Sequence, residues 1–256
     1  RPLALVDHVV APEDLARQVL EGIRFAAGVY RVPVVGGHLT RWEGAPSVSA
    51  SIVGRVVRPL RSVDVAPGQE CLVAFCLQGR MREDFPYFTS IPDRIAELAG
   101  DVALMADLAE AGLVAAAKDI SMAGTFGSLA MLLEPSRCGA LVDLDQIPRP
   151  DGAGLAAWTA VFPMYGFLLT ANAADVSAVC AAFHERGLAC ERVGTVDGSG
   201  RLRVRLAGHE SELVDLTSQA VTGLNGGGAA EAESPSSGGG APGTPSDPLR
   251  GASRGT

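Results

Sequence analysis

Apolar residues recur at helical spacing in several parts of the chain. In residues 12–30, Leu15, Val19 and Ile23 are four positions apart, and Pro12 suits the first turn of a helix. Similar patterns predict further helices at residues 98–112, 124–133, 154–162 and 172–187. In the last of these we expect Asn172 to be the N-cap and Gly187 to end the helix.

Other segments have the period-two pattern of β-strands. In residues 47–57, Val48, Ala50 and Ile52 alternate with serines, which predicts a half-buried strand. A short strand at residues 32–35 leads into the sequence GGHLTR. Further strands are predicted at residues 71–77, 140–144, 166–170, 189–196 and 201–206. The DGSG sequence between the last two predicts a turn, so we expect these two strands to form a hairpin.

Changes in composition along the chain suggest two domains and a tail. Residues 57–70, VRPLRSVDVAPGQE, are punctuated by proline and glycine, as in a connector. From residue 224 the chain is rich in glycine, serine and proline, with almost no large apolar side chain to offset the entropy of ordering. We therefore expect domains at 1–62 and 63–223 and a disordered tail at 224–256. Helices and strands alternate irregularly, which indicates an α+β fold with helices on a largely antiparallel or mixed sheet.

Composition argues against two classes of partner. The formal net charge is −8 and aromatic residues make up 5% of the chain, which does not suit non-specific nucleic-acid binding or a polybasic membrane surface. No apolar run approaches the roughly 20 residues of a spanning helix, and no signal-peptide pattern is present. The 5 cysteines match no zinc or disulfide spacing, and we interpret them as small buried side chains in a reducing cytoplasm.

The sequence VVGGHLTR is the first candidate for chemistry. Gly36 and Gly37 would let the backbone turn tightly and approach a ligand, with His38 and Thr40 as polar contacts. The alternative is a plain turn with a structural histidine.

The sequence KDISMAGTFG is the second candidate. Asp119, Ser121 and Gly124 come just before a predicted helix, whose free N–H groups would favour an anion, and Asp119 is a possible Mg²⁺ ligand. The alternative is that Asp119 or Ser121 caps the helix and Lys118 lies at the surface. The chain has no P-loop, Gly-x-Ser-x-Gly or HExxH motif.

Taken in order, four motifs resemble the AIR synthase superfamily, which includes thiamine-monophosphate kinase, selenophosphate synthetase and the hydrogenase maturation dehydratase. VPVVGGHLTR followed by SASIVGRV resembles the end of the family's N-terminal domain, and AAKDISMAGTFGSLAMLLE resembles its D-x-S-x-GG element. SRCGALVDLDQIP and GFLLTANAADVSAVCAAFHERGLACERVGTV resemble later elements of the C-terminal domain.

The resemblance implies a two-domain fold with a C-terminal α/β-sandwich-type domain and an N-terminal domain that is incomplete before Arg1. It implies an ATP- and Mg²⁺-dependent homodimeric enzyme that activates a small metabolite. Nucleotide or phosphate contacts would come from the residues that match the family's motifs, namely Gly36, Gly37, His38, Thr40, Ser121 and Gly124, with Asp119 on the metal. Leu39 is inserted before Thr40, Ala123 replaces a glycine, and Met122 replaces the acidic residue of the kinase branch. The alternative is a non-catalytic ligand-binding or partner subunit that retains the fold.

Overall fold

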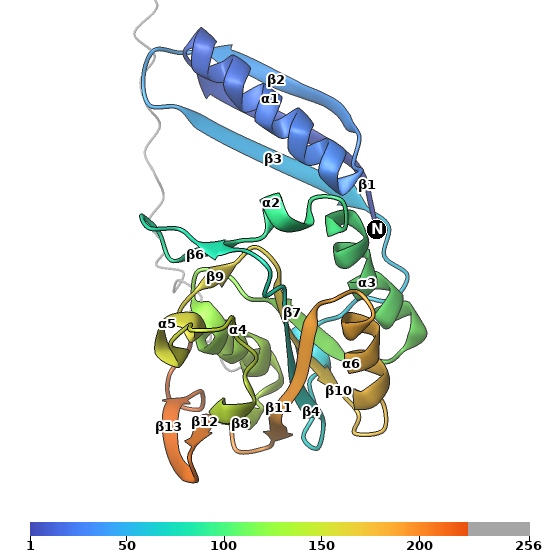
Figure 1. The fold of residues 1–256 in the computed structure, drawn as a ribbon, viewed down its shortest axis with the longest axis vertical. Helices are drawn as coiled ribbons and strands as arrows, with labels where there is room; N and C mark the ends of the chain where they lie inside the picture. The colour runs from blue at the N-terminus through green and yellow to red at the C-terminus, as the bar shows by residue number, and fades with distance from the viewer. Residues whose placement is uncertain (225–256) are drawn as a thin grey trace, which may run out of the picture. The chain divides into compact units, whose positions relative to one another are not determined.

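The computed structural model describes residues 1–224, so the predicted tail lies outside the described residues except for residue 224. Within residues 1–224 the chain forms a small sheet, a large sheet and a short third sheet, with helices on their faces (Figure 1). No helix in this part of the chain has the length and apolar character needed to cross a membrane.

The small sheet has three strands in the order β2-β1-β3, and one helix packs on it. Its elements are β1 (Pro2–Ala11), α1 (Glu13–Tyr30), β2 (Val34–Arg41) and β3 (Ser47–Gly54). β2 is parallel to β1 and β3 is antiparallel to it. α1 covers one face through Val9, Ala11 and Ala16 (Figure 1).

Two expectations for the small sheet are wrong. The predicted strand at 32–35 is instead β2, and it continues through Gly36 and Gly37, which therefore do not form a turn. β3 is not half-buried, because all of its residues are exposed. The main contacts of α1 with the small sheet are to β1 and β2.

The large sheet is mixed, as predicted. In sheet order its strands are β13 (His209–Asp215), β12 (Arg201–Leu206), β8 (Gly139–Asp143), β11 (Ala189–Asp197), β4 (Glu70–Phe75), β10 (Gly166–Ala171) and β7 (Ala116–Asp119). Only β12 and β8 pair in parallel within this sheet. The predicted β11–β12 hairpin is wrong, because β8 lies between these strands and β12 forms its hairpin with β13.

The remaining elements cover or flank this sheet. The helices are α2 (Ile91–Arg94), α3 (Leu98–Ala111), α4 (Gly124–Leu133), α5 (Leu155–Thr159) and α6 (Val176–His184), with 3-10 turns η1 (Ser62–Asp64), η2 (Glu134–Ser136) and η3 (Leu144–Gln146). The third sheet consists of β5 (Arg80–Met81), β6 (Tyr87–Thr89) and β9 (Phe162–Pro163). The expected N-cap Asn172 is wrong, because α6 begins after Asp175, to whose carboxylate the Asn172 amide donates.

The core has one layer on each face of the large sheet. On one face, Phe75 and Leu168 pack with Leu129 of α4. On the other, Leu72 and Leu169 pack with residues of α3 and α6. β4 and β10 are therefore buried on both faces, which agrees with their continuous apolar sequences.

The cysteines are unpaired, and all but Cys180 are buried. Burial raises the pKa of the Cys71 thiol to about 12, so this thiol stays protonated at neutral pH. The interpretation of the cysteines as small buried side chains is confirmed for Cys71, Cys76, Cys138 and Cys190.

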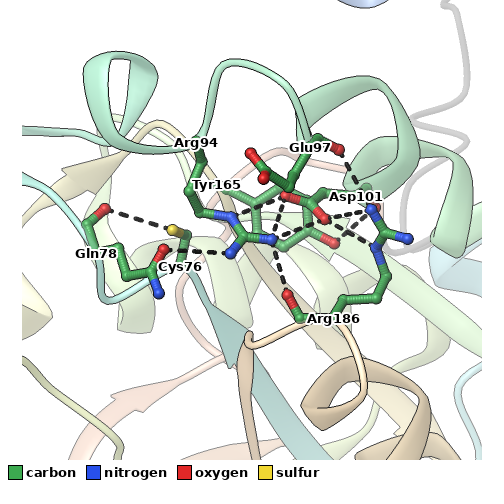
Figure 2. Close-up of polar contacts among 7 residues, drawn as sticks. All are labelled: Cys76, Gln78, Arg94, Glu97, Asp101, Tyr165 and Arg186. Atoms are coloured by element: carbon green, nitrogen blue, oxygen red, sulfur yellow. Dashed lines mark hydrogen bonds and ion pairs between the residues drawn. The ribbon is translucent and has the colours of Figure 1, made fainter.

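A buried carboxylate joins α2, α3 and the end of α6 (Figure 2). Asp101 is fully buried and accepts hydrogen bonds from Arg94 Nε at 3.0 Å and Arg186 Nε at 2.8 Å. Arg94 also donates to the Arg186 carbonyl at 2.8 Å, and Tyr165 Oη donates to the Asp101 carbonyl at 2.9 Å. The charge of Asp101 is therefore fully paired, which a buried carboxylate requires.

A second buried carboxylate holds the end of the described chain. Glu134 accepts hydrogen bonds from the backbone N–H groups of Val221 at 2.9 Å, Thr222 at 2.7 Å and Gly223 at 3.2 Å, and from the Thr222 hydroxyl. Burial by itself raises the pKa of Glu134, but these hydrogen bonds outweigh it and hold the pKa below its ordinary value.

We expect Asp101→Asn to lower the free energy of unfolding by about 3–5 kcal/mol, because it leaves two arginines beside a neutral side chain in a buried site. The control is Asp107→Asn on the exposed side of the same helix, where an ion pair with Arg1 is lost at a cost of less than about 1 kcal/mol. Urea unfolding measures both, and equal losses would contradict the role given to Asp101.

We expect Glu134→Gln to lower the free energy of unfolding at neutral pH by about 1.5–3 kcal/mol, since a charged acceptor is lost. The pKa is lower in the folded state, so the contribution of the carboxylate is present above the unfolded-state pKa and lost as the pH falls through the folded-state pKa.

Urea unfolding at neutral pH and at about pH 3 therefore should show the gap between wild type and Glu134→Gln narrowing in acid. Glu185→Gln is an exposed control that should change stability by less than about 0.5 kcal/mol. An equal difference in unfolding free energy between wild type and Glu134→Gln at both pH values would rule out stabilisation by the ionised carboxylate.

Candidate functional site

The two glycines of the first candidate element have different surroundings inside β2. A methyl group added at Gly37 would lie 2.6 Å from Asp7 Oδ1, since Gly37 pairs with Asp7 of β1. At Gly36 the nearest atom, a methyl of Val6, is 4.0 Å away. Glycine at 37 is thus favoured by the close approach of Asp7, whose backbone carbonyl oxygen would lie 2.9 Å from an added methyl group, and a tight turn is not the reason for either glycine.

Polar side chains from β1 and β2 meet on the face of the small sheet opposite α1. His8 Nε2 lies 3.2 Å from Thr40 Oγ1, and the rings of His8 and His38 are edge to face at 5.3 Å between centroids. Both histidines are exposed. His8 was missed in the sequence, where it had no visible partner; its pairing with His38 follows from the parallel register of β1 and β2.

The second candidate element begins in a strand. Lys118 and Asp119 are the last two residues of β7, the edge strand of the large sheet. Lys118 Nζ lies 3.0 Å from Asp119 Oδ1, and the Asp119 side chain is 62% exposed. The carboxylate is therefore accessible and has an ammonium group beside it.

The turn between β7 and α4 is fixed by backbone contacts. Gly124 N–H donates to the Ser121 carbonyl at 2.8 Å, and Ser121 N–H donates to Ser128 Oγ at 3.1 Å. Gly124 has φ of +67°, and a methyl group there would lie 2.5 Å from the Thr159 carbonyl oxygen. Glycine is needed at 124 for its conformation and for this contact.

Neither Asp119 nor Ser121 caps α4, so that alternative is wrong. The N-cap is Ala123, whose side chain makes no capping hydrogen bond. The Thr125 hydroxyl in this first turn is buried and has no hydrogen-bond partner in residues 1–224. The start of α4 therefore keeps donors that suit an anion, next to the exposed carboxylate of Asp119.

The structure assembles each candidate element locally but does not join them. His38 and Thr40 lie in the small sheet, whereas Asp119, Ser121 and Gly124 belong to the large sheet and the start of α4. Among residues 1–224 no hydrogen bond or ion pair connects the two elements, and no group of three or more His, Cys, Asp or Glu side chains has the arrangement of a metal site.

A pocket of about 570 Å³ borders Lys118 and Asp119. The connector contributes Leu60 to its walls, and the segment held by Glu134 contributes Thr222 and Leu224. The remaining apolar wall residues are Met105, Ala117, Met131 and Phe167, and Arg61 and Ser62 also line the pocket. Sequence reasoning missed this pocket, because its walls come from segments that are far apart along the chain.

Comparison with known proteins identifies two domain families in the chain. The family described as AIR synthase related protein, N-terminal domain, matches residues 1–56, and that described as AIR synthase related protein, C-terminal domain, matches residues 89–207. The boundary expected at residues 62 and 63 stays a prediction.

Individual relatives give the same assignment. An uncharacterized protein of Synechocystis sp. is 36% identical over 230 residues, covering 88% of this chain and 71% of that protein. The thiamine-monophosphate kinase of Rhodopirellula baltica is 31% identical over 140 residues, covering 55% of this chain and 41% of the kinase.

A solved structure shares the fold. The structure of Thermotoga maritima PurL in complex with ATP superposes with a TM-score of 0.69 at 20% identity, covering 85% of this chain and 37% of PurL. The chain thus spans little more than a third of that protein. With its two domain matches and its α+β architecture, the chain belongs to the AIR synthase-related family.

Proposed function

We propose that this protein is an ATP- and Mg²⁺-dependent cytoplasmic enzyme that activates a small metabolite by phosphoryl transfer. The observation that carries the proposal is the β7–α4 turn, where the exposed Asp119 carboxylate stands beside the uncapped N-terminus of α4. A carboxylate for a metal and free N–H groups for phosphate oxygens are the groups that phosphoryl transfer needs.

The residues present fit a magnesium ion that is only partly bound by protein. Mg²⁺ commonly keeps several waters and takes one or two carboxylates together with substrate phosphate. Asp119 would supply one carboxylate oxygen, and the ion would bring phosphate and protein charges together and neutralise charge on the transferred group.

The other groups have binding and orienting roles in this proposal. N–H groups of the first turn of α4 would hold phosphate oxygens, while the Ser121 and Gly124 N–H groups, which already donate within the turn, would fix the shape of the site. His38 and Thr40, with the backbone of Gly36 and Gly37, would contact the nucleotide from the small sheet. Two relatives support a nucleotide: PurL has been solved with ATP, and another relative is a kinase by name.

The second candidate function is a non-catalytic ligand-binding or partner subunit. It is favoured by Met122, which is 72% exposed and stands where the kinase branch has an acidic side chain. The ion pair of Asp119 with Lys118 also favours it, because a metal would have to compete with the ammonium group.

Calorimetric titration of the protein in its natural full length with ATP and Mg²⁺ separates the two functions. We expect saturable binding, and Asp119→Ala should weaken it by roughly tenfold or more, since a charged metal contact is worth at least about 1.4 kcal/mol. Asp143→Ala is the control, because this carboxylate at the end of β8 accepts a hydrogen bond from Asp145 N–H and is not part of the turn.

Thermal unfolding gives an independent readout of the same binding, with about 2.7 kcal/mol of stabilisation expected at a ligand concentration 100 times its dissociation constant. If ATP with Mg²⁺ gives no heat and no stabilisation, the non-catalytic function is preferred. Equal losses in Asp119→Ala and Asp143→Ala would remove Asp119 from the site.

We also propose that the protein is a homodimer joined through the small sheet. The support is β3, an edge strand whose residues are all exposed, including Val48 and Val53. An exposed apolar edge strand is a template for pairing with another chain. Val53→Lys should shift sedimentation velocity profiles toward monomer, while Val57→Lys, equally exposed but outside the strand, should not. A monomeric wild type would contradict this proposal.

A further inference from the structure

Lys118 is the only lysine in the chain, although 21 side chains are Lys or Arg. The two residue types are not interchangeable, because the lysine ammonium is a compact point charge with rotatable donors, whereas the guanidinium is a planar fork. Arginine occupies every other Lys or Arg position of the chain, which suggests that the lysine at 118 has a specific role.

The surroundings of Lys118 place its charge at a pocket. Its side chain is 25% exposed, so much of the aliphatic stem is covered by protein. Its ammonium group contacts Asp119 Oδ1 at 3.0 Å and the Asp119 carbonyl at 3.4 Å. Both residues line the 570 Å³ pocket, so a positive and a negative group stand side by side at its border.

The rest of the pocket is largely apolar, apart from Ser62, Thr222 and Arg61, whose guanidinium group is paired with Asp64. Leu60, Met105, Met131, Phe167 and Leu224 contribute to its walls. This volume is in the range of pockets that hold small organic molecules, and apolar walls with a few polar groups are the usual composition of such sites. Methionine and phenylalanine side chains pack well against flat aromatic bodies.

One wall of the pocket is held by a buried interaction. Thr222 lines the pocket, and its N–H and hydroxyl groups both donate to the Glu134 carboxylate. Leu224 follows two residues later, and its N–H donates to Thr222 Oγ1 at 3.2 Å. The wall is therefore part of the folded structure.

We propose that this pocket binds the second substrate, a small organic anion with a flat apolar body, and that Lys118 pairs with its anionic group. The inference rests on the proposed function, in which Asp119 turns to a magnesium ion shared with the nucleotide. The ammonium group has three donors, so Lys118 can contact the ligand while it stays beside Asp119, and it is released further when Asp119 turns to the metal. The second substrate would lie next to the transferred phosphoryl group, as the reaction requires.

Because the substrate is unidentified, the probe is anilinonaphthalene sulfonate, which combines a flat apolar body with one anionic group. The first readout is the rate at which acetic anhydride acetylates Lys118, followed by mass spectrometry of the full chain. Since Lys118 is the only lysine, the α-amino group is the internal reference. We expect the saturating probe to slow acetylation of Lys118 about tenfold and to leave the reference rate unchanged, since a paired and covered amine is withdrawn from solvent.

The second readout is the affinity of the probe, from its fluorescence. Lys118→Gln and Leu224→Ser should each weaken binding, the former about tenfold, as expected for loss of a charge-assisted contact. The matched controls are Arg149→Gln, which removes an exposed positive charge elsewhere, and Leu213→Ser, which removes an exposed leucine of β13. Both controls should change the affinity less than about twofold.

Unchanged acetylation of Lys118 in the presence of probe would overturn the proposal, as would equal losses of affinity in the site variants and their controls. Neither readout requires ATP. If the probe binds but ATP does not, the proposed enzyme is overturned and a pocket that binds organic anions remains. If ATP binds but the probe does not, the acceptor pocket is overturned and the ATP site remains.

Discussion

Burial of β4 and β10 on both faces is the constraint on which the rest of the molecule depends. Leu72 and Leu169 must be covered on one side of the large sheet, and Phe75 and Leu168 on the other, so helices are required on both faces. α4 forms one layer, and α3 and α6 form the other (Figure 1). β7 is the edge strand of this sheet, and its last residues, Lys118 and Asp119, lead into the turn before α4. Packing of the core thus fixes the position of the β7–α4 turn, although the Asp119 side chain in it is exposed.

The geometry of the β7–α4 turn explains how Ala123 can replace a glycine of the family motif. Ala123 has φ of −77°, which any residue adopts, so the turn does not need a glycine there. Its methyl group lies over Gly127, where an added methyl would be 2.6 Å away. Gly127 therefore makes room for the alanine, and Gly124 keeps the left-handed conformation that the turn does require. The turn is preserved in its backbone despite the replacement at position 123.

Local patterns in the sequence predicted local structure well. The helix predicted at 12–30, the helix predicted to end at Gly112 and the strand predicted at 71–77 are all present, the last as β4 (Glu70–Phe75), because periodicity and glycine signals act within a few residues. The missed features depend on distant pairing. β8 lies between β11 and β12, and Asp7 of the neighbouring strand closely approaches Gly37. Glu134 accepts hydrogen bonds from a segment 87 to 89 residues later in the chain. Asp119, Ser121 and Gly124 were found as a group because they are adjacent in sequence. His8 and the pocket walls were not, because only the fold brings them to their partners.

The proposed function requires that the turn from Asp119 to Gly124 faces the metal and phosphates of a nucleotide. The most direct measurement is paramagnetic broadening of backbone amide signals by Mn²⁺ in place of Mg²⁺, recorded on the full-length protein with and without ATP. With ATP present, we expect the amides of this turn and of the first turn of α4 to broaden first. Broadening concentrated elsewhere in the large sheet, with the Asp119 and Ser121 amides unaffected, would contradict it.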